Sequence, residues 1–377
     1  MIVFYITLTL LAILGGFFIL WEVPFLPTQA KRKRLDKRLS IIIPARNEEK
    51  NLPILLKSLQ KQSYQPYEIL VVDDDSQDQT AEVAVSYGAK VVQFPKDKRD
   101  WVGKAAGCYY GAQAAKGEWF LFLDADIFLP REDSLEKIID GYSKKAGPIT
   151  LSIQPYHVIE ELYENLSLIF NLLVLAGMNR FSFLQEKLEP AGAFGPSMLI
   201  NRETYFEKGG HKRARGSIME NIDLGRIFLE EGVPVDLYGG KDSLHFRMYS
   251  EGYKELAEGW SKSFVSGSKS THPLILIGTS LWIAGAFVTA FFIPYAWFIG
   301  EISLLILGMV GYILFYLQLL RMTRYAGNFH RGVLFLYPIL FFYFLYLFAW
   351  SAIKTKVFKQ VSWKGRTISM EEHADGK

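Results

Sequence analysis

The chain has 377 residues, of which half are hydrophobic and 15% aromatic, and its formal net charge is +3. So small a charge on so long a chain gives no argument for nucleic-acid binding. The single cysteine, Cys108, excludes an intrachain disulfide and suits a reducing compartment. Apolar residues gather at the N-terminus and beyond residue 272, which predicts one large domain combined with membrane segments.

The N-terminal segment, residues 2–21, carries no charge and is long enough to span a bilayer. A cleaved signal peptide is the alternative, but no positive residue precedes the apolar run and no clear cleavage site follows it. We therefore expect a membrane anchor over residues 1–22. A basic cluster follows it, which predicts a cytoplasmic position for the next domain. The cluster consists of Lys31, Arg32, Lys33, Arg34, Lys37 and Arg38.

Strands and helices are expected to alternate from residue 39 to residue 155. Short apolar runs bounded by turn residues predict strands at 40–45, 68–75, 89–94, 118–126 and 149–155. Helices are expected between them, near 47–61, 78–87, 103–116 and 133–144. This order predicts an α/β, Rossmann-like domain with a mostly parallel sheet covered on both faces. Ligands of such sheets bind beyond the carboxyl ends of the strands.

The following stretch, residues 156–265, has a mixed pattern and is expected to complete a domain over 39–265. Within it, residues 164–178 form an apolar stretch that is short for a span and predicts a core or interfacial helix.

Three apolar stretches follow within residues 273–352, at 273–293, 302–320 and 332–352, and each is long enough to cross a membrane. The loop from Arg321 to Arg331 is basic, and so is the tail over 353–377. Three full crossings would place one of these basic regions outside, against the positive-inside rule. Either one stretch is re-entrant or interfacial, or the rule is broken, and the sequence leaves both open.

The run Asp124-Ala125-Asp126 follows a strongly apolar segment. Two bare carboxylates at the end of a buried strand would be costly and would repel each other. A divalent cation, Mn²⁺ or Mg²⁺, held together with a diphosphate resolves both problems. A surface turn is the alternative. We expect Asp124 and Asp126 to be metal ligands, with Ala125 in the same nucleotide-sugar site.

Other candidate donor-site residues follow the first strands. Asp73 is expected to bind a base and Asp75 the ribose region, although acids here could also cap a helix. The backbone around Pro44, Ala45, Arg46 and Glu48 could cradle a nucleoside, or its acids could merely favour a helix start. Lys104 begins a predicted helix and could meet phosphate, or could simply be solvated.

Together these motifs, in this order and spacing, resemble the family 2 glycosyltransferases of the GT-A fold. The matching runs are PARNEE (44–49), VVDDDS (71–76), GK (103–104) and DAD (124–126). The resemblance covers about residues 39–265, and it implies that 39–155 is the nucleotide-sugar half and 156–265 the acceptor half. It implies an inverting, metal-dependent transfer from a UDP-sugar, with Asp126 on the metal.

A narrower resemblance, to members of this family that act in carotenoid biosynthesis, extends over nearly the whole chain. It rests on runs such as SIQPYH (152–157), AFGP (193–196) and GGHK (209–212). It implies glucosylation, from UDP-glucose, of a membrane-dissolved carotenoid acid to a glycosyl ester, and other enzymes of that pathway as partners. Another lipid acceptor, such as a polyprenyl phosphate or diacylglycerol, is the first alternative. A non-catalytic membrane scaffold is the second, and the intact DAD argues against it.

One departure from the family concerns the general base. The family usually shows Glu-Asp where this chain has Glu220-Asn221, followed by Asp223. A carboxylic acid acceptor has a pKa of about 4 and is already a nucleophile at cytoplasmic pH, so it needs no base. Asn221 would not repel such an anion, whereas an aspartate would. Alternatively, Asn221 is a neutral helix-start residue and Glu220 or Asp223 is an ordinary base.

The resemblance also assigns residues near the diphosphate and the acceptor. Arg247 is expected to stabilise the leaving diphosphate. His211, His245 and Trp260 are expected on the acceptor side, with structural packing as the alternative for each. We expect a multi-pass plasma-membrane enzyme whose catalytic domain is cytoplasmic.

Overall fold

The computed structural model describes most of the chain, namely residues 2–27, 37–94, 101–145, 147–217, 219–261, 270–358, 360–363 and 366–369. The predictions for Lys31 to Arg34 and for most of the basic tail lie outside these ranges. The chain divides into two compact units, which we call the helical unit and the sheet unit. The helical unit comprises 1–23, 158–191 and 249–359, and the sheet unit comprises 24–157, 192–248 and 360–377.

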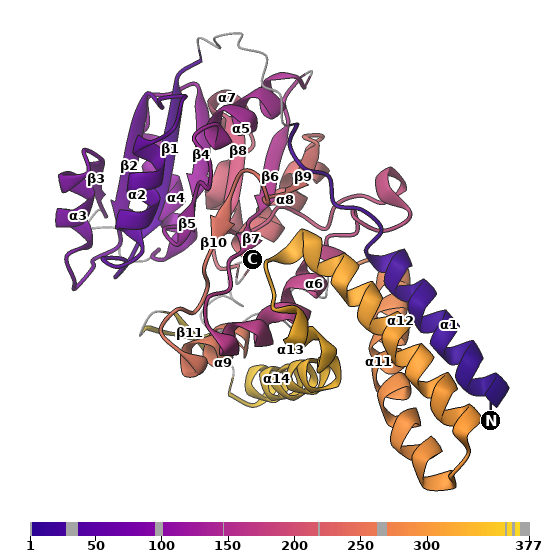
Figure 1. The fold of residues 1–377 in the computed structure, drawn as a ribbon. Helices are drawn as coiled ribbons and strands as arrows, with labels where there is room; N and C mark the ends of the chain where they lie inside the picture. The colour runs from indigo at the N-terminus through magenta and orange to yellow at the C-terminus, as the bar shows by residue number, and fades with distance from the viewer. Residues whose placement is uncertain are drawn as a thin grey trace. The chain divides into compact units, whose positions relative to one another are not determined.

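The sheet unit is built on a seven-stranded sheet with the order β3-β2-β1-β4-β8-β6-β9 (Figure 1). Neighbouring strands are parallel except where β8 pairs with β4 and with β6. The sheet is therefore mostly parallel, as predicted. Its strands are β1 (Leu39–Ala45), β2 (Glu68–Asp73), β3 (Lys90–Gln93), β4 (Trp119–Leu123), β6 (Thr150–Gln154), β8 (Ser197–Asn201) and β9 (Val235–Gly239).

Helices cover both faces of this sheet. One face packs against α2 (Leu52–Gln60), α3 (Thr80–Ser86) and α5 (Ser134–Ser143) in the main apolar core. The alternation of side chains along a strand sends Ile41 and Ile43 into this core, and Ile42 to the opposite face. There Ile42 meets Gly111 of α4, and Phe122 packs against Tyr205 of α7. The bounds of these two helices are Lys104–Ala114 and Arg202–Glu207.

A second, three-stranded sheet has the order β5-β10-β7. It consists of β5 (Ile127–Phe128), β10 (His245–Phe246) and β7 (Tyr156–His157). Since β5 follows the DAD run directly, this small sheet connects that run with the segment around Arg247. The remaining elements of the sheet unit are η3 (Gly210–Ala214), α8 (Glu220–Glu230), β11 (Gln360–Trp363) and β12 (Arg366–Ser369).

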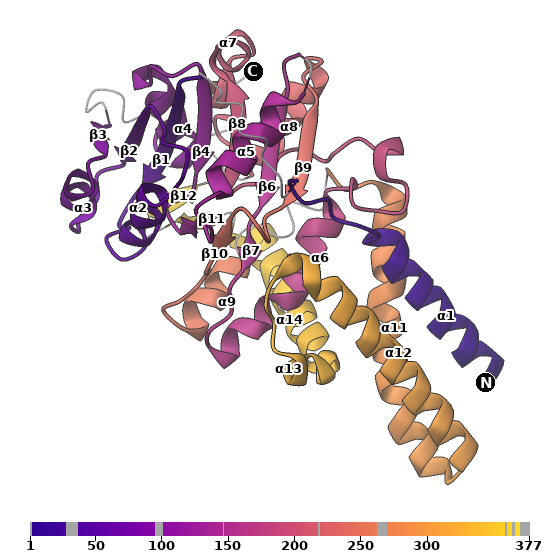
Figure 2. The same ribbon diagram turned by 45° about the horizontal axis from the view of Figure 1, so that its top comes forward.

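The helical unit contains three helices that are long and apolar enough to cross a membrane, α1 (Ile2–Ile19), α11 (Pro273–Ile299) and α12 (Ile302–Ala326). They lie side by side in Figure 2, with the ribbon of α1 in indigo. These helices indicate membrane association. Its other elements are η1 (Leu162–Ser167), α6 (Leu168–Gly177), η2 (Gln185–Lys187), α9 (Tyr253–Ser261), α13 (Arg331–Phe335) and α14 (Tyr337–Phe358).

Two stretches differ from the expectation. The apolar run 332–352 is divided between α13 and α14, so it does not form one uninterrupted helix. Residues 158–191 and 249–261 belong to the helical unit, although 156–265 was expected to complete the sheet domain. The apolar helix expected at 164–178 is present as η1 and α6.

Candidate active site

The carboxyl ends of β1 and β2 are held together by their loops. The parallel register places Ala45 beside Asp73. The buried guanidinium of Arg46 then donates to the carbonyls of Asp74 and, at 3.0 Å, of Asp75. The backbone N–H of Glu48 donates to the hydroxyl of Thr80 at 2.8 Å. The PARNEE and DDDS segments therefore form one continuous edge at the end of the sheet.

Two residues of this edge have left-handed backbone angles. Asn47 has φ 54° and Asp75 has φ 56°, a conformation that Asn and Asp tolerate better than other non-glycine residues. Asn47 is fixed by its N–H, which donates to Ser76 at 3.0 Å, and by its side-chain oxygen, which accepts from the N–H of Gln77 at 2.9 Å. Such strained positions often mark functional loops. Asn47 was not among the predicted site residues.

The three acids after β2 have different surroundings. Asp73 is buried and accepts from the N–H of Ser76 at 3.2 Å. Asp74 is also buried and accepts at 3.2 Å from the N–H of Gly103, the residue before α4. Asp75 is exposed. The buried Asp74, which was not among the predicted site residues, therefore ties the β2 edge to the start of α4.

Lys104, the first residue of α4, connects three parts of the site. Its Nζ lies 2.6 Å from Oδ1 and 2.8 Å from Oδ2 of Asp124, 2.8 Å from the carbonyl of Gly195, and 3.5 Å from Oε1 of Glu220. Burial alone would lower the pKa of Lys104, but the Asp124 and Glu220 carboxylates outweigh burial and raise it. The ammonium is therefore charged and joins the DAD run to the start of α8.

The DAD run itself lies at the end of β4. The side chain of Asp124 is 26% exposed, and its N–H donates to the carbonyl of Pro196 at 3.0 Å. Ala125 is buried, and Asp126 is partly exposed just before β5. β5 pairs antiparallel with β10, with Ile127 opposite Phe246. Continued by one residue, this register would bring Asp126 opposite Arg247.

The chemistry of this donor set fits Mn²⁺ or Mg²⁺. Both ions prefer oxygen ligands, and Mg²⁺ is commonly held by one or two carboxylates plus water and substrate phosphates. Over the described ranges, no group of three or more His, Cys, Asp or Glu residues is placed to hold a metal. Asp124 and Asp126 are the candidate ligands for such an ion, with the oxygens of a diphosphate as further ones.

Asn221, at the family's base position, belongs to a buried hydrogen-bonded chain. Tyr205 donates from its hydroxyl to Nδ1 of His211 at 2.9 Å, which leaves Nε2–H to donate to Oδ1 of Asn221 at 3.1 Å. The amide of Asn221 donates in turn to the carbonyl of Gly195, which also accepts from Lys104. Asn221 is 3% exposed and His211 is fully buried. Both ring nitrogens of His211 are therefore used within the protein.

The two acids that flank Asn221 point to different partners. Glu220 faces Lys104 and so lies at the DAD cluster. Asp223 accepts from the hydroxyl of Ser217 and lies 3.1 Å from Arg226, one helical turn further on. Of the two candidate bases, the structure brings only Glu220 into the cluster with Asp124.

The start of α8 is fixed by a close backbone contact. A Cβ on Gly225 would lie 2.2 Å from the backbone nitrogen of Ala193, a distance that no side chain can occupy. Only glycine therefore allows α8 to pack so closely against the segment that leads to Gly195.

We expect the Gly225→Ala substitution to destabilise the sheet unit by about 1–3 kcal/mol, because the extra methyl group must displace backbone. In an unconstrained helix the same change would be stabilising by about 1 kcal/mol. Thermal unfolding of the purified protein measures the effect. Gly141→Ala in α5 is the control, since the nearest atoms to its Cβ are side-chain atoms of Leu26 and Leu151 and not backbone. Equal unfolding temperatures for the two variants would contradict the expectation.

Two buried histidines of the sheet unit, His157 and His211, make it sensitive to acid. Burial lowers the pKa of each from 6.5 to about 3. The unfolded chain binds these protons below pH 6.5 while the folded chain does not, so stability falls as the pH drops from 6.5 toward 3. Each histidine contributes about 1.4 kcal/mol per pH unit in that window.

We therefore expect the unfolding temperature to fall steadily between pH 6.5 and pH 5, before most carboxylates titrate. The His211→Gln variant, whose side chain can still hydrogen-bond, should show a shallower pH dependence than the original protein. An unfolding temperature that stays constant from pH 7 to pH 5 would rule out this account.

The other two predicted acceptor-side residues, His245 and Trp260, have partners of their own. His245, on β10, donates to the carbonyl of Lys241 at 2.8 Å and lies between the rings of Phe128 and Tyr156. Trp260 belongs to the helical unit, where its Nε1–H donates to Ser167 at 2.9 Å and its ring stacks on Phe170. Their proposed roles toward an acceptor stay predictions.

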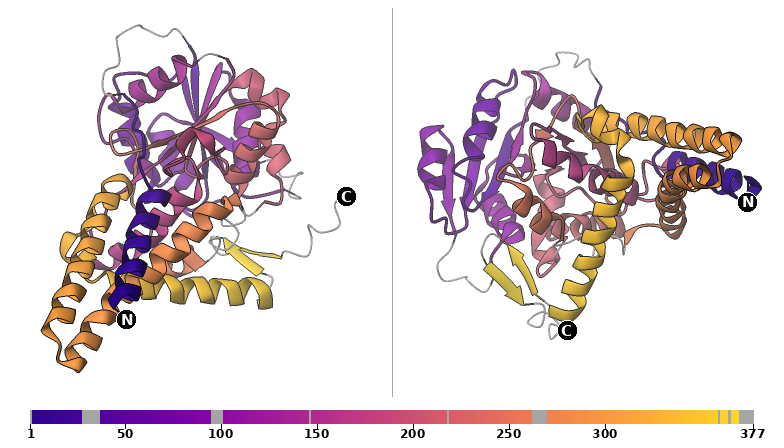
Figure 3. Two further views of the ribbon diagram at one scale, coloured as in Figure 1. Left: turned by 90° about the vertical axis from the view of Figure 1, so that its right-hand side faces the viewer. Right: turned by 60° about the horizontal axis from the view of Figure 1, so that its bottom comes forward.

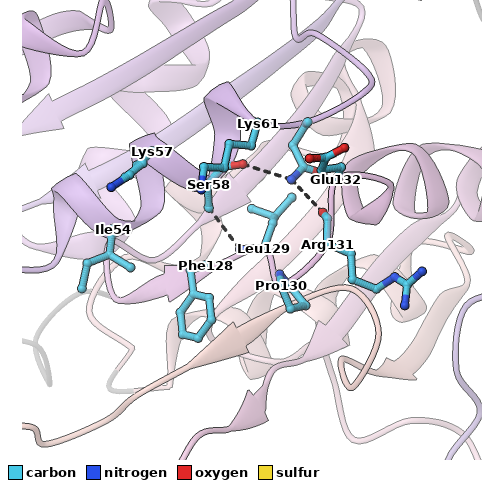
Figure 4. A pocket seen from close by; sticks show the side chains of 10 residues that line it. Ile54, Lys57, Ser58, Lys61, Phe128, Leu129, Pro130, Arg131 and Glu132 are labelled. Carbon is cyan, nitrogen blue, oxygen red and sulfur yellow. Dashed lines mark hydrogen bonds between the residues drawn. The ribbon is translucent and has the colours of Figure 1, made fainter.

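A pocket of about 480 Å³ lies elsewhere in the sheet unit, where α2 faces the segment after β5 (Figure 4). Its lining includes Lys57, Lys61, Phe128 and Arg131. Phe128 follows the DAD run by two residues, but none of the predicted donor-site residues lines this pocket.

Residues 40–210 match the model of Glycosyl transferase family 2, and the chain belongs to this family. It is a glycosyltransferase with the GT-A fold, so the predicted family and fold class are confirmed. Over 349 residues it is 38% identical to the 4,4'-diaponeurosporenoate glycosyltransferase of Staphylococcus aureus strain USA300, covering 91% of this chain and 92% of the relative. The enzyme of the same name from strain MRSA252 is 37% identical over 348 residues, with the same coverage.

Among solved structures, the mannosyltransferase PcManGT from Pyrobaculum calidifontis, in complex with GDP-Man and Mn²⁺, has a similar fold. Its TM-score is 0.57 at 17% identity, and the match covers 94% of this chain and 96% of that one. At 17% identity, this similarity is evidence for a shared fold and not for a shared substrate.

Proposed function

We propose that the protein is an inverting, metal-dependent glycosyltransferase that moves glucose from UDP-glucose to the carboxylate of a membrane-dissolved carotenoid acid. The observation that carries the proposal is the cluster in which Lys104 contacts both Asp124 and Glu220, beside a neutral Asn221. The name of the relatives that share 38% identity over 91% of the chain supports the acceptor class.

The donor would bind at the edge formed by β1, β2 and β4. Asp73 would bind the uracil and Asp75 the ribose, while the backbone from Pro44 to Glu48 holds the nucleoside. Asp124 and Asp126 would hold Mn²⁺ or Mg²⁺, which offsets the charge of the departing diphosphate when bound. Lys104 and Arg247 add positive charge at the same end of the sheet, where that negative charge develops.

The acceptor would need no general base. A carboxylic acid with a pKa of about 4 is ionised near neutral pH. Its oxygen forms a bond to the anomeric carbon from the face opposite the diphosphate, and the bond between that carbon and the diphosphate oxygen breaks, with its electron pair leaving on UDP. No proton is transferred. Glu220 is ion-paired with Lys104. Its role in this proposal is to hold the positive charge of Lys104 at the site, and not to act as a base.

We further propose a multi-pass plasma-membrane protein whose sheet unit is cytoplasmic. The basic residues after α1 favour the cytoplasm for the side on which α1 ends. Arg321, near the end of α12, donates to the carbonyls of Leu20 and Trp21 after α1, and its guanidinium lies over the ring of Phe17. The ends of α1 and α12 therefore share one side.

An assay of membranes that contain the protein tests the substrate proposal. UDP-glucose, Mn²⁺ and a panel of acceptors are supplied, and the lipid products are separated and treated with mild alkali. A product formed from a carotenoid acid and cleaved by alkali supports a glycosyl ester. Products formed only from polyprenyl phosphate or diacylglycerol would favour the alternative acceptors, and no product with any acceptor would favour a scaffold.

A further inference from the structure

The ends of the three long helices are aligned by their contacts. Gly15 of α1 lies against Gly278 of α11, and Ala12 lies against Gly285, so these two helices are antiparallel. The helices α1 and α12 are parallel, since Gln318 donates to the carbonyl of Ile13 at 2.6 Å and Arg321 to that of Leu20 at 3.0 Å. The end of α1, the start of α11 and the end of α12 therefore lie on one side of the bundle.

α13 leads back into the bundle from that side. Its N-cap His330 donates from its backbone N–H to the side chain of Asn165 at 2.8 Å. It then runs antiparallel to α12, because Tyr316 contacts the carbonyl of Arg331 and Tyr312 contacts that of Phe335. Tyr312 precedes the last residue of α12 by 14 positions. At a rise of 1.5 Å per residue, the end of α13 therefore lies level with a point on α12 that is about 21 Å from the last residue of α12.

α14 then returns toward the side from which α13 came. Tyr337 hydrogen-bonds Thr289 of α11 at 2.7 Å, whereas Phe341 packs on Trp282, half-way back to the start of α11. Beyond this point Phe344 packs on Phe170 of α6, and the next helix that α14 meets is α9. The course of α14 diverges from the three-helix bundle, as Figure 3 shows.

The neighbour α9, whose Tyr253 lies against Tyr343, marks the level that α14 approaches. The exposed face of α9 carries charged residues, which belong in water or among headgroups and not in hydrocarbon. These residues are Lys254, Glu255 and Glu258. α9 is tied to η1, where Trp260 donates to Ser167, and Asn165 of η1 accepts from the backbone of His330 just after α12. These contacts within the helical unit indicate that α14 turns back toward the side on which α12 ends.

The outward face of α14 is apolar along the part that returns. Ile339, Phe342 and Tyr346 are 59%, 64% and 60% exposed, while Leu340 and Phe344 on the opposite face are buried. An apolar helix with such an exposed apolar face fits the hydrocarbon of a bilayer. Phe342 also lies against Phe287 of α11, a helix that is itself apolar enough to cross a membrane.

We propose that α13 and α14 form a re-entrant element, which enters the bilayer from the cytoplasmic side, turns at Leu336 and returns to that side in contact with lipid. The proposal rests on the membrane placement given above. It leaves three crossings, α1, α11 and α12, in the part of the chain that the structure describes. The basic loop after α12 and the basic tail then lie on one side, so the conflict with the positive-inside rule disappears.

Labelling of one added cysteine at a time, on intact and on permeabilised cells, tests this topology. The native Cys108 is buried, so the unmodified protein gives the background. Three positions are used. Residue 301 lies between α11 and α12, the exposed residue 230 lies on α8 of the sheet unit, and residue 374 lies in the tail; the variants are Glu301→Cys, Glu230→Cys and Ala374→Cys. With an impermeant maleimide, we expect the Glu301→Cys variant to be labelled on intact cells, and the other two only after permeabilisation.

The outcomes separate the two proposals. Labelling of the Ala374→Cys variant on the opposite side from the Glu230→Cys variant would overturn the re-entrant element, whatever the orientation of the protein. Labelling of the Glu230→Cys variant on intact cells would instead overturn the cytoplasmic placement of the sheet unit. The course of α14 would still be decided by whether residues 230 and 374 are labelled on the same side of the membrane.

Discussion

Sugar transfer by the Asp126→Asn variant is expected to fall by about a thousandfold or more, which corresponds to ~4 kcal/mol of lost transition-state stabilisation. The substitution keeps the size of the side chain and removes one of two carboxylates that could hold the metal. Asp124 would remain as the one DAD carboxylate on the ion, and it shares both of its oxygens with Lys104. The rate of UDP release from UDP-glucose in the presence of a carotenoid acid measures the effect.

The matched control is Asp140→Asn, which removes a carboxylate from the same unit at the ion pair with Lys144, on α5. It should keep its activity, since surface pairs of this kind contribute little to stability. Binding of UDP by the Asp126→Asn variant should also lose most of its dependence on added Mn²⁺. A variant that transfers sugar at the original rate would show that this carboxylate does not hold the metal.

The edge formed by the PARNEE, DDDS and DAD segments could be predicted from the sequence because its signals are local. An apolar run followed by acids predicts a strand end, and the β-α alternation then brings such ends together. The structure places Asp73 beside Ala45, and Asp124 beside Lys104, in agreement with that logic. Asp74 and Asn47 were missed because their roles depend on contacts with other loops, which no local pattern reveals.

The buried chain around Asn221 could not be predicted for the same reason. His211 lies ten residues before Asn221, and Tyr205 six before His211, yet all three meet only because η3 folds back on α8. Hydropathy likewise found the run 332–352 but not its division, since length and composition are the same for a crossing and a re-entrant helix. The direction of α14 is set by its aromatic contacts with α11 and α6.

The second large effect is expected from Asn221→Asp. The new carboxylate would be almost fully buried and could not donate to the carbonyl of Gly195, as the amide of Asn221 does. It would face that carbonyl oxygen instead, which is repulsive, and it would place a negative charge beside Nε2 of His211. We expect the pKa of His211 to rise and transfer to a carotenoid acid to fall about 10- to 100-fold.

The specificity of the loss distinguishes two roles for Asn221. If its neutrality serves an anionic acceptor, the Asn221→Asp variant should lose far more activity with a carboxylate than with a hydroxyl-bearing lipid, because only the former is repelled. If the amide mainly positions Gly195 and Lys104, activity should fall equally with both acceptors, and His211→Gln should give a similar, weaker loss. Full activity of the Asn221→Asp variant on the carotenoid acid would exclude both roles, and would leave Asn221 as an ordinary residue at the start of α8.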